Sequence, residues 1–238
     1  MIPRSSFPCS ILPAAACLPN LPALPGGRQA ALTIDRDARR LILRGEIDED
    51  APGAVHPSEL IRTIESALEQ SPHLVLDIDS PGGSTKGVAE AAAFIRETVR
   101  AGADITAHTS GELCSAAYWL AVPCRRITAT RGAIVGNVGV WALFQEFSEA
   151  DRAAGIRTAL LTSGELKTAG HPALPLTPAQ LAFLSAQVQA MAELFFDDVF
   201  TARPTIHADA VRSGRYCLAR EALKLGFIDA IVQPMPKA

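Results

Sequence analysis

The sequence predicts an α/β fold, built from βαβ units around a mainly parallel sheet, and three observations support this prediction. Short apolar runs alternate with helical stretches from residue 32 onward, no internal repeat is present, and 48% of the 238 residues are apolar. Strands that alternate with helices pair in parallel through crossover connections. An apolar fraction of this size supplies a sizeable core and excludes a wholly disordered chain.

The first 30 residues have a different character. An apolar segment at residues 11–24 has the look of a secretory signal, but Pro13, Pro19 and Pro22 would break a helical signal. We therefore expect a Pro-rich disordered leader at residues 1–30 and a single domain at residues 31–238. No stretch reaches the ~20 apolar residues that span a bilayer, so we expect a cytoplasmic protein rather than a secreted or periplasmic one.

The expected strands are short apolar runs bounded by turn residues, at residues 41–47, 74–78, 105–108, 126–129, 158–161 and 228–232. A first helix is predicted over residues 58–70, where Leu60, Ile64 and Leu68 lie on one side. A second covers the Ala-rich residues 85–101 and stops before Gly102, because glycine suits the left-handed position that follows a helix end.

The longest predicted helix covers residues 177–202. Thr177 and Gln180 form a capping box at its start, and Pro178 occupies the first helical position. Apolar residues then recur at steps of three and four residues. This stripe is typical of a packing surface, so it is expected to contact the core or a neighbouring subunit rather than a cofactor.

Charge and cysteine content argue against several classes of partner and cofactor. The 22 basic and 25 acidic residues leave a net charge of −3, so the electrostatics do not favour nucleic acid or an anionic membrane as a partner. The five cysteines are an odd number without a close C-x-x-C pair, which argues against a disulfide framework or a zinc ribbon. Since no His, Cys and Asp residues have metal-ligand spacing, no metal or cofactor is expected.

The first segment with chemical potential is a buried strand that runs into a tight turn at residues 79–83, Asp-Ser-Pro-Gly-Gly. Gly82 and Gly83 at the carboxyl end of a parallel strand let backbone N–H groups face a ligand without obstruction by Cβ atoms. An oxyanion hole or an anion nest fits this turn, and an ordinary strand-to-helix turn is the alternative. A phosphate loop is excluded, because the G-x-x-x-x-G-K-[ST] spacing is absent.

The second segment places Ser115 at the start of a helix of small residues, after a short strand. A serine there has its Oγ near the positive end of the helix, which favours developing negative charge, and the Ala116 amide would be an oxyanion donor. The alternative for Ser115 is a helix N-cap. Cys114 is interpreted as a small buried residue.

The third segment, residues 162–172, carries a single lysine, Lys167, in a glycine-bounded loop after an expected strand. A lysine acts as a general base only when neutral, and burial must then lower its pKa from the ordinary value of about 10.4. Apolar neighbours such as Leu161 and Leu166 permit this burial, and a solvated loop lysine is the alternative. None of the histidines offers a better base.

Taken in order, these segments resemble the signal peptide peptidase A (SppA) family of serine peptidases. Within that family, the motifs resemble those of the soluble phage and prophage members that process capsid scaffolds. The resemblance runs from residue 41 to residue 232. The segments that carry it are Asp79-Ser80-Pro81-Gly82-Gly83, Cys114-Ser115-Ala116-Ala117-Tyr118, residues 132–140 and residues 164–172.

The resemblance implies a ClpP/crotonase-like fold and a Ser–Lys dyad that acts through an acyl-enzyme. Ser115 would be the nucleophile and Lys167 the general base, while the backbone amides of Gly82, Gly83 and Ala116 would form the oxyanion hole. It also implies a homo-oligomer without a cofactor, and a polypeptide substrate such as a phage scaffold, portal or capsid protein. The sequence departs from the family pattern at Asn137-Val138, where members usually have Ser-Ile, and at His171-Pro172, where they usually have Asn-Pro.

Two other functions remain open from the sequence. One is an acyl-CoA enzyme of the related crotonase fold, although no well-placed pair of catalytic glutamates is present. The other is a non-catalytic assembly module, in which the long helix and an exposed Phe195-Phe196 pair would support contacts between subunits.

Overall fold

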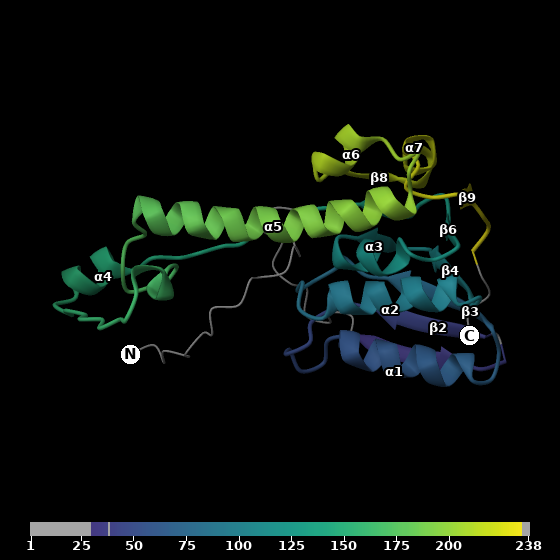
Figure 1. Ribbon diagram of the computed structural model, residues 1–238, viewed down its shortest axis with the longest axis horizontal. Helices are drawn as coiled ribbons and strands as arrows, with labels where there is room; N and C mark the ends of the chain where they lie inside the picture. Colours follow the sequence, from purple (N-terminus) through teal and green to yellow (C-terminus); the bar gives the residue numbers. More distant parts are fainter. Residues whose placement is uncertain (1–29, 38, 235–238) are drawn as a thin grey trace.

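The structure is a computed structural model that describes residues 30–37 and 39–234. The predicted leader at residues 1–30 lies outside the described residues except for Ala30, so the division into a leader and one domain stays a prediction. Figure 1 shows a body of sheets and helices from which one half of a long helix and its neighbouring loops project to one side.

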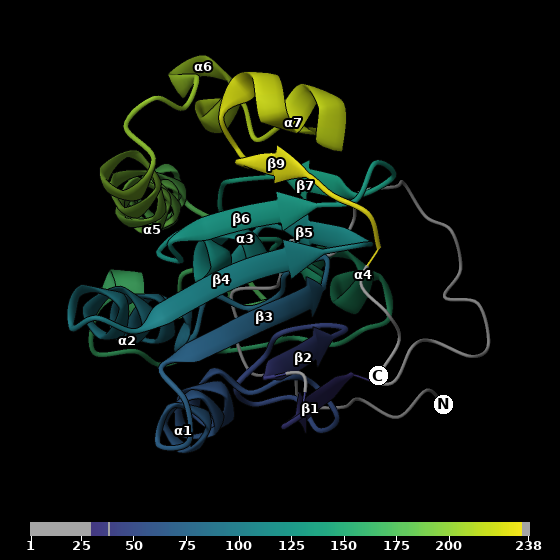
Figure 2. The ribbon, with the colours of Figure 1, turned by 90° about the vertical axis from the view of Figure 1, so that its right-hand side faces the viewer.

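The larger sheet has six strands in the order β1-β2-β3-β4-β6-β9 (Figure 2). Neighbouring strands pair in parallel except β1 and β2, which form an antiparallel edge. The strands are β1 (Ala31–Asp35), β2 (Arg40–Arg44), β3 (His73–Asp79), β4 (Asp104–Thr109), β6 (Arg126–Ala129) and β9 (Ala230–Ile231). The predicted α/β class with a mainly parallel sheet is confirmed.

A second sheet of three short strands has the order β5-β7-β8. Its strands are β5 (Glu112–Cys114), β7 (Ile134–Gly136) and β8 (Tyr216–Leu218). An isolated bridge between Ser80 and Leu113 joins the turn after β3 to β5. The glycine turn and the serine segment, 32 residues apart when counted from Gly83 to Ser115, therefore meet at the junction of the two sheets.

Helices α1 (Pro57–Leu68) and α2 (Val88–Arg100) lie on the same side of the larger sheet (Figure 2). Leu60 and Ile64 of α1 and Ile95 of α2 are buried in the core, as their helical spacing predicts. The remaining helices are α3 (Ala116–Ala121), α4 (Ser148–Ala153), α5 (Pro178–Ala202), α6 (Ala208–Arg212) and α7 (Ala219–Leu225), with a 3₁₀ turn η1 (Glu165–Thr168). No helix within the described ranges combines the length and the apolar character needed to cross a membrane.

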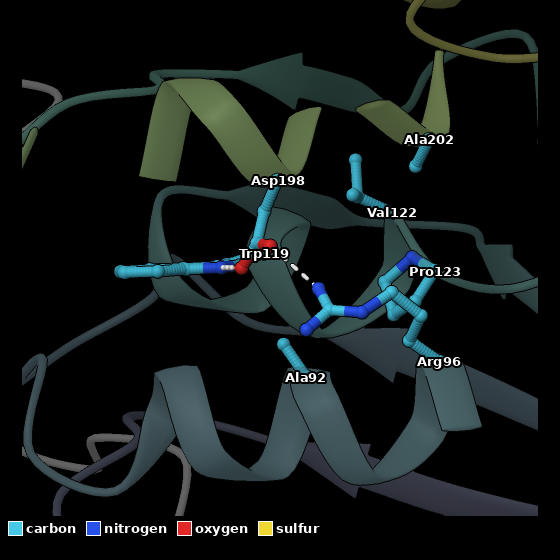
Figure 3. Close-up of a pocket in the computed structure, with 7 residues that line it drawn as sticks. All are labelled: Ala92, Arg96, Trp119, Val122, Pro123, Asp198 and Ala202. Atoms are coloured by element: carbon cyan, nitrogen blue, oxygen red, sulfur yellow. Dashed lines mark hydrogen bonds and ion pairs between the residues drawn. The ribbon is translucent and has the colours of Figure 1, made fainter. Parts of the chain in front are cut away.

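Asp198, in the carboxyl-terminal half of α5, contacts both α3 and α2. Its carboxylate accepts a hydrogen bond from Trp119 Nε1 at 2.8 Å and pairs with Arg96 Nη1 at 2.5 Å (Figure 3). The Trp119 ring stacks on Phe195 with 4.4 Å between ring centroids. Between these side chains lies a cavity of about 10 Å³, the size of one water molecule. These contacts fix one half of α5 to the body of the protein.

The other half of α5 belongs to an arm, which we define as residues 139–190. The arm contains an extended segment, α4, η1 and the first half of α5, and it exposes several large apolar side chains to solvent. These are Trp141, Leu143, Phe147, Ile156, Leu161, Leu166 and Leu181. Unpartnered apolar side chains gathered on one projecting segment are typical of a contact surface.

Two expectations for the carboxyl-terminal half of the chain are wrong. Residues 158–161 form no strand, because this apolar run lies on the arm, where Leu161 is 97% exposed and no neighbouring strand is available. The Phe195-Phe196 pair is buried, since Phe195 packs on Trp119 and Phe196 contacts Arg212 and Phe200. Contacts between subunits therefore cannot use this pair.

Candidate active site

The glycine turn packs directly against the serine segment. Gly82 has a φ of +102°, and a Cβ atom there would lie 2.7 Å from Ser115 Cβ and 2.9 Å from the Ala116 nitrogen. The turn is held on its other side by Ile47, whose nitrogen donates to the Gly82 carbonyl oxygen at 2.9 Å. Only glycine allows this approach, so the predicted proximity of the glycine turn and the serine is present.

Ser115 has a strained backbone, and its hydroxyl group does not cap the helix that follows. Its φ of 52° and ψ of −126° lie outside the regions that a residue with a Cβ atom prefers. Its nitrogen donates to the Gly136 carbonyl oxygen at 2.9 Å, which holds the turn in this conformation. Although Ser115 occupies the N-cap position of α3, its side chain makes no capping hydrogen bond. The ordinary reason for a serine at a helix start is therefore missing.

Two backbone N–H groups are available for an anion, one in the glycine turn and one in the residue that follows Ser115. Within the described residues, neither Gly83 nor Ala116 donates its N–H to a backbone oxygen outside the regular helices and strands, and Ala116 as the first residue of α3 has no partner within the helix. The N–H of Gly82 differs, since it donates to Ser80 Oγ at 3.1 Å. An anion stabilised here would therefore rest on Gly83 and Ala116, with Gly82 permitting their approach.

Gly82→Ala is expected to lower the free energy of unfolding by about 2–4 kcal/mol, because it combines a positive φ with a steric clash. The added methyl group would lie 2.7 Å from Ser115 Cβ and 2.8 Å from the Cys114 carbonyl oxygen. Gly102→Ala is the matched control, since its φ is +113° but nothing lies within 4 Å of its Cβ position. Urea unfolding of both variants separates the clash from the backbone strain, and equal losses would contradict the close approach.

Lys167 lies in η1 on the arm, and its side chain is exposed. The turn η1 is attached to the first turn of α5, where Gln180 Nε2 donates to the Glu165 carbonyl oxygen at 2.8 Å. Ser115 lies one turn before Trp119, which packs on Phe195 near the other end of α5. Residues 180 and 195 of this continuous helix are about 22 Å apart along its axis. The structure therefore does not bring Lys167 to Ser115 within one chain.

The carboxylates of β3 have structural partners. Asp77 is buried and pairs with Arg44 at 2.9 Å and with Arg40 at 3.6 Å. Asp79 Oδ1 accepts a hydrogen bond from the Glu112 nitrogen at 2.9 Å, which ties β3 to β5. On β4, burial lowers the pKa of His108. The contacts of Asp77 and Asp79 therefore give both carboxylates a structural role, and Asp79 stabilises the turn after β3.

A cleft of about 520 Å³ opens beside the glycine turn, and Pro81 and Ile134 are among the residues that line it. Glu46, Asp79 and Glu112 also line the cleft, and burial, followed by the nearby Asp48, raises the pKa of Glu46. Among the residues that the structure describes, no group of three His, Cys, Asp or Glu side chains is arranged to hold a metal ion.

The sequence pattern does not show how two residues after β7's start act near the serine turn. One is Gly136, whose carbonyl oxygen accepts the Ser115 hydrogen bond. The other is the position of Asn137, which has a φ of 55° and donates its N–H to the Arg215 carbonyl oxygen at 2.8 Å. The only sequence signal for either was the glycine-rich segment at residues 132–140, in which the departure from Ser-Ile occurs.

The fold and the site together define an α/β protein with a serine on a strained turn beside a glycine turn. This serine makes no capping hydrogen bond. Residues 97–234 match Peptidase family S49. This match covers more than half of the chain, so the chain belongs to Peptidase family S49.

Several curated proteins are similar to this chain. Protease 4 of Salmonella typhi is 23% identical over 195 residues, which are 77% of this chain and 30% of that protein. Capsid assembly protease C of Escherichia phage lambda is 29% identical over 126 residues, 53% of this chain and 28% of that protein. Head-tail preconnector protein GP5 of Enterobacteria phage P21 is 33% identical over 98 residues, 41% of this chain and 19% of that protein. The matched part of the chain spans 30% or less of the length of these three relatives.

Proposed function

We propose that the chain is a serine endopeptidase of ClpP/crotonase-like fold, with Ser115 as nucleophile and Lys167 as general base. The observation that carries this proposal is the backbone of Ser115, which is strained at φ 52° while its side chain makes no capping hydrogen bond. Strain of about 1–3 kcal/mol on a serine that caps no helix is typical of a nucleophile on a sharp turn. Membership of a peptidase family agrees with it.

The proposed mechanism uses these groups in the following order. Neutral Lys167 Nζ takes the Ser115 proton while Oγ attacks the peptide carbonyl carbon, and the resulting oxyanion accepts hydrogen bonds from Gly83 N–H and Ala116 N–H. The tetrahedral intermediate collapses, the C–N bond breaks, and the lysine ammonium gives its proton to the leaving amine. Water, deprotonated by Lys167, then hydrolyses the acyl-enzyme and regenerates Ser115.

The separation of Lys167 from Ser115 along α5 supports a dyad formed between two copies of the chain. The amino-terminal half of α5 projects beyond the body of the protein and carries η1 with it (Figure 1). The exposed apolar side chains of the arm, such as Leu161 and Leu166, would be covered in such an assembly. A homo-oligomer is therefore part of the proposed function.

The substrate class proposed is a polypeptide, bound in the cleft that Pro81 and Ile134 line. Two of the similar proteins are named for roles in phage particles, a capsid assembly protease and a head-tail preconnector. On that basis we propose a phage scaffold, portal or capsid protein as the natural substrate. Co-expression with such a protein and mass spectrometry of its fragments would test this choice.

Cleavage of unfolded casein by the wild type, Ser115→Ala and Lys167→Ala across a pH series tests the proposed activity. The wild type alone is expected to cleave, because cleavage needs both the Ser115 hydroxyl group and the Lys167 amine. Equal activity in all three proteins would contradict the dyad. A wild type that is folded and assembled but inactive on casein and phage proteins alike would favour the assembly module instead.

A further inference from the structure

One polar side chain stands out in the arm. Across residues 139–190, all of which are described, Gln180 is the only buried residue, at 7% exposure, while several large apolar side chains of the arm, such as Leu166 and Leu181, are exposed. Polar side chains on a segment without its own hydrophobic core are normally exposed. A buried amide group needs hydrogen-bond partners. The burial of Gln180 therefore calls for a specific explanation.

The amide of Gln180 connects α5 to the turn that carries Lys167. Its Nε2 donates to the Glu165 carbonyl oxygen at 2.8 Å and to Thr168 Oγ1 at 3.3 Å, so it holds both ends of η1. Its Oε1 accepts from the Thr177 nitrogen at 3.2 Å, which completes the capping box of α5. One side chain thus caps the helix with its oxygen and holds η1 with its nitrogen.

We propose that Gln180 is a positioning residue, which holds the Glu165 backbone and the Thr168 side chain, on either side of Lys167, at the start of α5. This inference rests on the proposed function, in which Lys167 is the general base. A four-residue 3₁₀ turn has few hydrogen bonds of its own, and a base displaced by about 1 Å can lose on the order of 100-fold in rate. Because Gln180 holds Glu165 and Thr168 together, the Lys167 side chain has a restricted orientation. In the proposed assembly, this orientation directs its amine to Ser115 of another copy.

The substitution Gln180→Glu separates the two roles of this side chain. Glutamate keeps an oxygen for the Thr177 N–H and is a standard capping-box residue, and its charge suits the helix start. It has no N–H group, so it cannot donate to Glu165 or Thr168 and would repel the Glu165 oxygen. Gln187→Glu is the matched control, because it makes the same change at an exposed position of the same helix.

Steady-state kinetics on casein, thermal unfolding and size-exclusion chromatography of the full chain test the proposal. Gln180→Glu is expected to lower kcat by roughly 10- to 100-fold with KM within about threefold, while the melting temperature and the assembly match those of the control. Wild-type kcat in this variant would overturn the inference, and so would a loss of assembly or of melting temperature that accounts for the lost rate. An inactive wild type would instead remove the proposed function on which the inference rests.

Discussion

A mixture of the Ser115→Ala and Lys167→Ala variants is expected to cleave casein, although neither variant does so alone. If the dyad forms between copies, each site in a randomly mixed assembly receives an intact Ser115 and an intact Lys167 in about a quarter of cases. The mixture should then reach about a quarter of the wild-type rate per site. The reason is the length of α5, which separates η1 from the Trp119–Phe195 contact within one chain.

The control is a mixture of the wild-type protein with a Ser115→Ala/Lys167→Ala double variant, which shows whether copies exchange under the conditions used. If copies exchange, the rate per wild-type chain should fall. The reason is that some wild-type Ser115 side chains are then paired with a double-variant copy, which has no Lys167. If exchange occurs and the two single variants still give no activity together, Ser115 and Lys167 must act within one chain. The arm would then have to fold back toward α3.

The sequence predicted the elements whose signals are local. The capping box of Thr177 and Gln180 and the helix that follows are present as expected, because a cap depends on residues three positions apart. The strand at residues 126–129 also matches β6. By contrast, β5 and β7 have three residues each and exist because they pair with each other and, through β7, with β8. No local pattern identifies strands that are set by distant partners.

The candidate site was predictable in composition but not in geometry. The order of the motifs indicated Ser115 and the glycine turn, and the structure brings these two together. Their conformation depends on a hydrogen bond from Ser115 to Gly136, which a sequence pattern does not reveal. The distance between Ser115 and Lys167 depends on how α5 packs against α3. The stacking of Phe195 on Trp119 fixes that packing. Long-range contacts of this kind carry no local signal.

Ser115→Gly is expected to abolish activity and to stabilise the protein at the same time. Loss of the hydroxyl group removes the nucleophile, which costs on the order of 10⁴-fold or more in rate. The backbone at φ 52° and ψ −126° suits glycine and disfavours residues with a Cβ atom. The relief of strain exceeds the extra entropy of the unfolded chain, so the expected gain is about 1 kcal/mol, or roughly 2–4 °C in melting temperature.

Ser115→Ala is the comparison that makes this result informative, because it removes the same hydroxyl group but keeps the Cβ atom and its strain. Both variants should be inactive, and only Ser115→Gly should melt above the wild type. Ala116→Gly, one residue further into α3, should lose roughly 0.5–1 kcal/mol, since its backbone is helical. A Ser115→Gly protein less stable than Ser115→Ala would contradict the strained turn. The strained backbone of Ser115 lowers the free energy of unfolding. This loss is expected where a nucleophile occupies a sharp turn at the junction of two sheets.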